Sequence, residues 1–102
     1  MKKVLYINTG DRDLVEVRLV VGSKVYKDKV SRSRNSQIVL NTIDKVLSRA
    51  KIKPQELTEI EVFTGPGSFT GLRVGIAIGN AFARSLNIKI NGKKQVVDAK
   101  YE

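Results

Sequence analysis

The chain has 102 residues, no cysteine, no histidine and a formal net charge of +9. This length corresponds to one domain with a single core. The missing residue types exclude thiolate nucleophiles, disulfides and Cys/His zinc sites, and they remove the usual general base of acyl transfer. We therefore expect neither a metal site nor a cofactor.

The positive charge is concentrated in the first half of the chain. Residues 1–53 hold 13 basic and 5 acidic residues, a net charge of +8, whereas residues 54–102 hold 6 and 5, a net charge of +1. Such a face attracts phosphates or an acidic protein, or it only keeps the protein in solution. In the densest run, "KVYKDKVSRSR", the candidate RNA contacts are Lys27, Lys29, Arg32 and Arg34.

Two sequence features bear on membrane contact. The opening "MKKVLYINTG" lacks the long apolar core of a signal peptide, and no stretch reaches membrane-spanning length. We expect a cytoplasmic protein without membrane contact.

The first third of the chain predicts three antiparallel strands. "KVLYIN" (residues 3–8) is a short β-prone run that is followed by the turn-like "NTGDRD". In "LVEVRLVV" (residues 14–21) every second side chain is suited to one buried face. Residues 22–23, "GS", turn this strand into "KVYKDKV" (residues 24–30).

The remaining elements alternate between helix and strand. Apolar residues at helical spacing predict a helix over residues 36–50, which Pro54 stops. A strand follows at residues 59–64, and a second helix is expected from about Gly71 to Leu86. "NIKIN" is a further short strand, and residues 95–102 are expected to form a short strand and a flexible tail.

The element order β-β-β-α-β-α-β predicts an α/β fold with a mixed five-stranded sheet. The meander pairs strand two with strand one, and right-handed crossovers place strand four on the other side of strand one. The expected spatial order is 3-2-1-4-5. Because both helices cross between parallel strands, they should lie side by side on one face.

The glycine-rich turn "TGPGSFTGLR" lies between the fourth strand and the second helix. Its spacing is one residue too long for the dinucleotide motif G-x-G-x-x-G and does not fit the P-loop motif. A strand-to-helix turn can still bind an anion at a helix N-terminus, or its glycines only permit a sharp turn. The candidate anion or nucleotide site comprises Thr9, Gly10, Gly65, Gly67, Ser68 and Arg73.

Three glycines lie within the second predicted helix. Gly71, Gly75 and Gly79 are four residues apart and form, with Ala83, a ridge without large side chains. Each interior glycine costs about 0.8–1 kcal/mol relative to alanine, so close packing must compensate. The neighbour could be the chain's own sheet or first helix, or a helix of another subunit, and spacing alone leaves these alternatives open.

The block from Gly65 to Arg73 resembles the signature of the bacterial TsaB (YeaZ) proteins, and the resemblance is strongest over residues 64–90. It implies one lobe of the actin/hexokinase/Hsp70 superfamily, a ribonuclease H-like fold. It also implies a non-catalytic scaffold in tRNA N6-threonylcarbamoyladenosine formation, in a superfamily once labelled peptidase M22. The implied partners are a TsaD-like catalytic subunit, a TsaE-like ATPase and a second copy in a homodimer, with tRNA contacted indirectly.

Three departures from the family pattern argue against enzymatic activity. Asn8, Thr9 and Gly10 stand where the family has D-T-S, so the turn lacks the carboxylate that would coordinate nucleotide-bound Mg²⁺. Asn35 and Ser36 stand where the first helix of the family begins with histidine and serine. The chain also ends after the fifth expected strand, so residues 1–102 are expected to form a single lobe without an interlobe cleft.

The preferred interpretation is therefore a scaffold that binds its partner through the two helices. Basic tRNA binding and a degenerate nucleotide-binding lobe are the alternatives. On the preferred interpretation, Gly75→Leu or Gly79→Leu should leave the monomer folded but abolish partner binding. The expected interface residues are Leu40, Ile43, Leu47, Gly71, Val74, Gly75, Ile78, Gly79, Phe82 and Ala83.

Overall fold

A computed structural model describes residues 1–11, 14–31 and 36–94. The predicted strand and tail at residues 95–102, and the candidate RNA contacts Arg32 and Arg34, lie outside these residues. The elements are β1 (Lys3–Asn8), β2 (Leu14–Val21), β3 (Lys24–Ser31), α1 (Ser36–Ala50), the 3-10 helix η1 (Pro54–Glu56), β4 (Glu59–Val62), α2 (Phe69–Leu86) and β5 (Lys89–Ile90).

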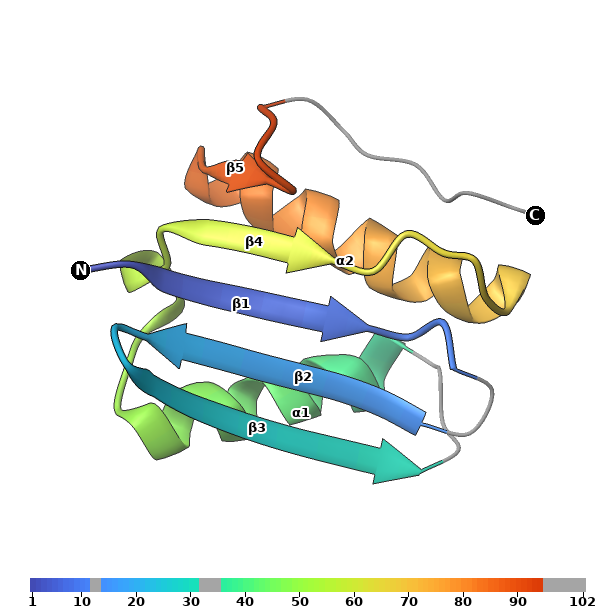
Figure 1. The fold of residues 1–102 in the computed structure, drawn as a ribbon, viewed down its shortest axis with the longest axis horizontal. Coiled ribbons are helices and arrows are strands. Elements are labelled where there is room, and N and C mark those ends of the chain that lie inside the picture. The colour runs from blue at the N-terminus through green and yellow to red at the C-terminus, as the bar shows by residue number, and fades with distance from the viewer. Residues whose placement is uncertain (12–13, 32–35, 95–102) are drawn as a thin grey trace.

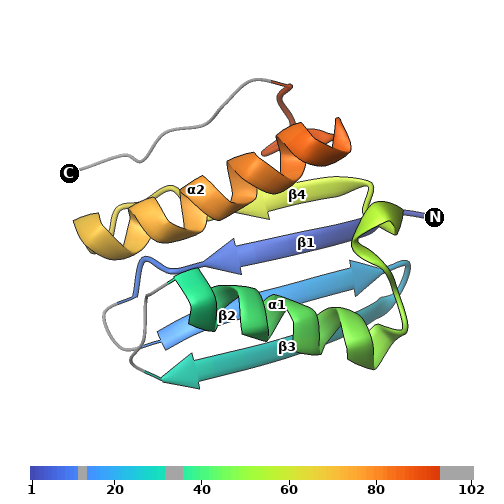
Figure 2. The same ribbon diagram turned by 180° about the vertical axis from the view of Figure 1, so that it is seen from behind.

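The sheet has the predicted order β3-β2-β1-β4-β5. Strand β1 pairs antiparallel with β2 and parallel with β4, and β4 pairs parallel with β5. Figure 1 shows the sheet from its open face, with both helices behind it. Figure 2 shows the opposite side, where α1 lies over β2 and β3 while α2 lies over β4 and β1. The mixed topology and the single helical layer are therefore confirmed.

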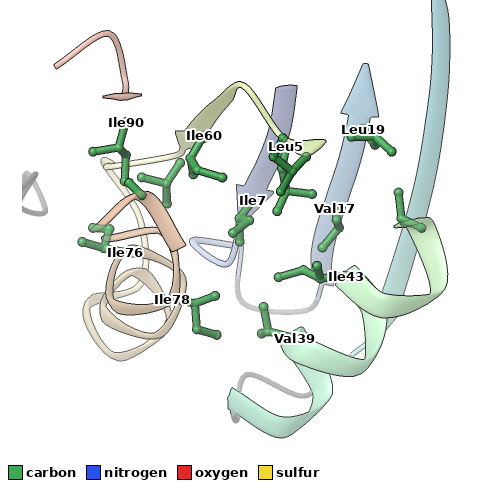
Figure 3. Packing of buried hydrophobic residues seen from close by; sticks show 14 of the residues in the cluster. Leu5, Ile7, Val17, Leu19, Val39, Ile43, Ile60, Ile76, Ile78 and Ile90 are labelled. Atoms are coloured by element: carbon green, nitrogen blue, oxygen red, sulfur yellow. The ribbon is translucent and has the colours of Figure 1, made fainter. Parts of the chain in front are cut away.

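The core lies between the sheet and the two helices. Alternation in β2 buries Val15, Val17 and Leu19 on the helical face, as the period of two requires. Helices α1 and α2 contribute further apolar side chains to this core, and Figure 3 shows Val39 and Ile43 of α1 and Ile76 and Ile78 of α2 among them. Burial of these apolar side chains supplies the main driving force for folding.

Local signals account for the ends of the helices. Helix α2 begins two residues earlier than predicted, because Ser68 is its N-cap and its Oγ accepts a hydrogen bond from the Gly71 N–H at 3.4 Å. It ends at Leu86, and its C-cap Asn87 has a left-handed φ of 57°. After α1, Pro54 begins η1, and the Glu56 carboxylate accepts a hydrogen bond from the Lys53 N–H at 2.9 Å.

The second half of the sheet ends in a very short strand. Strand β5 has only two residues, and the Asn91 side chain continues its pairing with β4. Asn91 Oδ1 accepts from the Val62 N–H at 2.8 Å, and Asn91 Nδ2 donates to the Val62 carbonyl at 3.0 Å. No helix within the described residues has the length and apolarity needed to cross a membrane.

Candidate functional site

The glycine turn brings the end of β4 and the start of α2 against the turn that follows β1. The Ser68 N–H donates to the Gly10 carbonyl at 3.0 Å, and the Gly10 N–H donates to Asn8 Oδ1 at 2.9 Å. A Cβ on Gly67 would lie 2.8 Å from the Gly10 carbonyl oxygen, so the two turns touch through their backbones. Gly65 has a φ of 120°, which only glycine adopts readily. The glycines therefore serve a tight turn-to-turn contact.

Thr9 connects this turn to the body of α2. Its side chain is 1% exposed, and its hydroxyl donates to the Gly71 carbonyl while accepting from the Gly75 N–H at 3.0 Å. A buried hydroxyl that makes two such bonds is fully engaged in the fold. Thr9 therefore holds the end of β1 against the first turns of α2.

The candidate anion site is only partly assembled. The structure brings Thr9, Gly10, Gly67 and Ser68 together, but the bonds described for the Thr9 hydroxyl, the Gly10 N–H and the Ser68 N–H are made to the protein itself. Arg73 is exposed and lines a groove on the outer side of α2. A phosphate would have to displace internal hydrogen bonds, so the structure does not support a preformed anion site.

The glycine ridge of α2 faces the chain's own sheet. A Cβ on Gly75 would lie 2.5 Å from Thr9 Oγ1 and 3.4 Å from Ile7 Cγ2. A Cβ on Gly79 would lie 3.2 Å from Ile90 Cδ1 and 3.4 Å from Val62 Cβ. Gly71 and Ala83 are buried on the same side.

The assignment of this ridge to the partner surface is therefore wrong. Its residues provide close approach to β1, β4 and β5 instead. The expectation that Gly75→Leu would leave the monomer folded fails for the same reason, because a large side chain has no room against the sheet.

The large predicted interface residues divide into two groups. Ile43 and Leu47 are 2% and 3% exposed and belong to the core, so their assignment to a partner surface is corrected as well, whereas Ile78, 8% exposed, packs in the core and also lines the groove described below. Leu40 is 40% exposed, and Val74 and Phe82 are partly exposed at the boundary between the helices. The core residues fill the space over the sheet, as Figure 3 shows for Ile43 and Ile78.

A shallow groove lies between the start of α1 and the outer side of α2. It has a volume of about 480 Å³ and is lined by Ser36, Thr70, Arg73, Val74, Ala77 and Ile78. Sequence reasoning missed Ala77 and Ala81, which are exposed on α2. The signal was present, because positions two residues from Gly75 and Gly79 project to the opposite side of a helix with 3.6 residues per turn.

The basic residues gather where α1 ends beside β3. Lys27 and Lys29 are exposed on β3, and Arg49 Nη1 donates to the Lys27 carbonyl at 3.2 Å. Lys51 and Lys53, which follow α1, are exposed as well. Within the described residues, no group of three or more acidic, histidine or cysteine side chains is arranged to hold a metal ion.

Comparison with known proteins places these features in a family. A family model described as TsaD, tRNA N6-adenosine threonylcarbamoyltransferase, matches residues 23–93. The tRNA threonylcarbamoyladenosine biosynthesis protein TsaB of Buchnera aphidicola is 41% identical over 75 residues, which cover 67% of this chain and 36% of the relative. TsaB of Bacillus subtilis is 33% identical over 60 residues, covering 59% of this chain and 26% of the relative. The chain thus spans about a third of the length of these relatives.

A solved structure shows the same fold. YeaZ from Pseudomonas aeruginosa superimposes with a TM-score of 0.82 and 23% identity, covering 88% of this chain and 42% of that protein. The match supports the α/β lobe described above. Since the family model, the curated relatives and the fold agree, the chain belongs to the TsaB/YeaZ family, within the wider group that the TsaD family model describes.

Proposed function

We propose that the chain is a non-catalytic subunit in the biosynthesis of N6-threonylcarbamoyladenosine on tRNA. On this proposal it binds a TsaD-like catalytic protein, or a second copy of itself, through the outer sides of α1 and α2. The pathway is supported by the names of the curated relatives, which are tRNA threonylcarbamoyladenosine biosynthesis proteins. A TsaE-like ATPase would complete the complex, and tRNA would be contacted mainly through the partner.

The apolar groove between the helices carries the proposal. Leu40 of α1 is 40% exposed, and Val74, Ala77 and Ile78 of α2 line the groove between the start of α1 and the outer side of α2. Exposed apolar side chains that gather around a groove are typical of protein interfaces. Ala77 and Ala81 are small and exposed, so the backbone of a partner helix could approach α2 closely on this side.

The hydrogen bonds that the two turns make within the fold support a non-catalytic role. Thr9 and Ser68, which would be candidates for holding a nucleotide, make hydrogen bonds within the fold. The Asn8 side chain is uncharged, and its Oδ1 accepts a hydrogen bond from the Gly10 N–H. These contacts fix the position of α2 and thereby of the groove.

The proposal is tested by co-expression with the TsaD-like protein of the same organism, followed by size-exclusion chromatography with mass measurement. We expect a complex with the wild-type chain and no complex with Ala77→Glu, which places a charge in the groove. The matched control is Gln55→Glu, which adds the same charge on exposed η1. A wild-type chain that never enters a complex would overturn the proposal, as would equal binding by both variants.

A second candidate function is direct binding of tRNA by the basic side of the molecule. The observation that favours it is the number of exposed lysines on β3 and just after α1, with Arg49 of α1 in contact with β3; they are Lys24, Lys27, Lys29, Lys51 and Lys53. Among the described residues, Lys24, Lys27, Lys51 and Lys53 form no ion pair with a carboxylate.

Fluorescence anisotropy with labelled tRNA tests this candidate. Binding should weaken by a factor of ten or more between about 50 and 200 mM salt, because cations are released from the phosphates. Lys51→Glu with Lys53→Glu should abolish it, while Lys89→Glu on β5 should have a much smaller effect. Absence of binding at low salt would eliminate direct tRNA recognition and leave the partner-binding proposal intact.

A further inference from the structure

Strand β3 forms one edge of the sheet, because β2 is its strand partner in the described part of the chain. In an antiparallel ladder, alternate residues turn their backbone N–H and C=O groups away from the neighbouring strand. Lys27 and Lys29 belong to this outward set, since the Lys27 carbonyl and the Lys29 N–H bond to side chains rather than to β2. Val25, two residues before Lys27, belongs to the same outward set and is 58% exposed. An open edge of this length is a template for another strand.

Two side chains occupy the middle of this edge. Asp28 Oδ1 accepts from the Lys29 N–H at 3.1 Å, and Arg49 Nη1, reaching down from α1, donates to the Lys27 carbonyl at 3.2 Å. Arg49 Nη2 also lies 3.4 Å from Asp28 Oδ2, so the two side chains hold each other in place. One outward donor and one outward acceptor are thereby already bonded.

We propose that Asp28 and Arg49 form a clasp that closes the β3 edge, and that the strand kept out by this clasp is β3 of a second copy. An incoming strand needs the Lys27 carbonyl and the Lys29 N–H, and both are already bonded to the clasp. The clasp would have to open before any ladder could form across the middle of β3.

A second copy fits this edge better than an arbitrary strand. Two identical strands that meet antiparallel about a two-fold axis present the same outward groups to each other. If the axis passes beside Lys27, Val25 of each copy lies opposite Lys29 of the other, and only the two Lys27 side chains are a like-charged pair. This single repulsion is screened by salt, because the Debye length is about 8 Å at physiological ionic strength. Repulsion between the two Lys27 side chains is therefore by itself a weak barrier to pairing of the two β3 edges.

The edge is separate from the groove between the helices. Arg49 of α1 contacts Lys27 and Asp28 of β3, whereas the groove lies between the start of α1 and the outer side of α2. Figure 2 shows α1 over β2 and β3 and α2 over β4 and β1. The inference does not depend on the proposed function. Leu40→Asp can remove association through the helices, so any remaining association can be assigned to the edge.

Size-exclusion chromatography with mass measurement across a concentration series tests the clasp in the Leu40→Asp background. We expect the parent to remain monomeric, while Arg49→Ala and Asp28→Ala each shift the mass toward a dimer. Adding Val25→Pro should restore the monomer, because proline removes an outward N–H that the new ladder requires. The matched control is Lys27→Gln, which relieves the lysine repulsion but keeps the clasp and should stay monomeric.

Hydrogen exchange gives an independent readout of the same edge. In dilute monomeric Asp28→Ala, the Lys29 amide should exchange roughly two- to tenfold faster, the range expected for loss of one exposed hydrogen bond. At high concentration its protection should return as the second copy pairs. The proposal is overturned if both clasp variants remain monomeric, if Lys27→Gln alone dimerises, or if the dimer survives Val25→Pro.

Discussion

The two sides of helix α2 both carry small residues, but they serve different purposes. On the inner side, Gly75 and Gly79 lie against the sheet, where a Cβ would approach Thr9 Oγ1 at 2.5 Å and Ile90 Cδ1 at 3.2 Å. On the outer side, Ala77 and Ala81 are exposed, and Ala77 lines the groove beside Val74. Glycine is needed where another part of the chain is already in contact, while alanine is accommodated where the side of the helix is exposed.

This difference explains why a ridge of small residues is ambiguous in a sequence. Glycine in a helix costs about 0.8–1 kcal/mol relative to alanine, so it requires a compensating contact but does not identify that contact. In this chain the compensation comes from β1, β4 and β5. Substitutions on the two sides should therefore separate folding from partner binding.

Gly75→Leu is the substitution with the largest expected effect. The new side chain would enter the space that Thr9 and Ile7 occupy, and the rigid end of β1 has little freedom to move away. We expect the free energy of unfolding to fall by about 3 kcal/mol or more, near the upper end for overpacking in a core. Urea unfolding followed by circular dichroism measures the change.

Ala77→Leu is the matched control for Gly75→Leu on the outer side. It adds a similar volume to the same helix where the side chain is exposed. Its free energy of unfolding should stay within about 0.5 kcal/mol of the wild type, as is usual for surface substitutions. Equal destabilisation by the two variants would contradict the assignment of inner and outer sides.

Thr9→Val is expected to have the next largest effect. Valine has nearly the same shape as threonine but cannot bond to the Gly71 carbonyl or the Gly75 N–H. Gly71 and Gly75 are i, i+4 neighbours in α2, so their backbone groups remain helical partners, and loss of the threonine hydrogen bonds should cost about 0.5–1.5 kcal/mol. Thr9→Ser keeps the hydroxyl and should recover most of the loss in the same unfolding measurement. If serine were destabilising and valine were not, the methyl group rather than the hydroxyl would fix α2.

Much of the fold could be predicted from the sequence because its signals are local or periodic. Alternation in residues 14–21, the spacing of Val39, Ile43 and Val46, and the break at Pro54 determine the elements, and the crossover rules then determine their order. The orientation of α2 could not be predicted in this way. It depends on Thr9, which lies 62 residues from Gly71 and contacts it only in the folded chain.

The candidate site was harder to predict than the fold. Leu40 and Val74 were identified as interface residues and do lie on the outer side, but Ile43 and Ile78 have the same apolar character and are buried. Ala77 and Ala81 were missed because the interface was assigned to the glycine ridge, although their spacing from Gly75 and Gly79 places them on the opposite side of α2. The edge clasp of Asp28 and Arg49 joins residues of two elements and has no signature in either segment.

Gly79→Ala should have a smaller effect than Gly75→Ala. Its added Cβ would meet the flexible end of Ile90 at 3.2 Å, which can shift, whereas the Cβ at position 75 would meet Thr9 Oγ1 at 2.5 Å. The helical preference for alanine, worth about 0.8–1 kcal/mol, then nearly offsets the close contact. We expect a change in unfolding free energy of less than about 1 kcal/mol for Gly79→Ala, and a clear loss for Gly75→Ala. The reverse order would mean that β5, rather than Thr9, limits the approach of α2.

Ala77→Glu should have the smallest effect on stability and still be the most informative about function. The glutamate would project from the exposed side of α2, so the free energy of unfolding should change by no more than about 0.5 kcal/mol. In a complex that covers the groove, the same carboxylate would lose its hydration without gaining a cation or a hydrogen-bond donor in return. The affinity for the TsaD-like protein should therefore fall by roughly tenfold or more, since this factor corresponds to only about 1.4 kcal/mol. Titration with the partner by calorimetry measures this loss, and unchanged affinity together with unchanged stability would show that the outer side of α2 is not the binding surface.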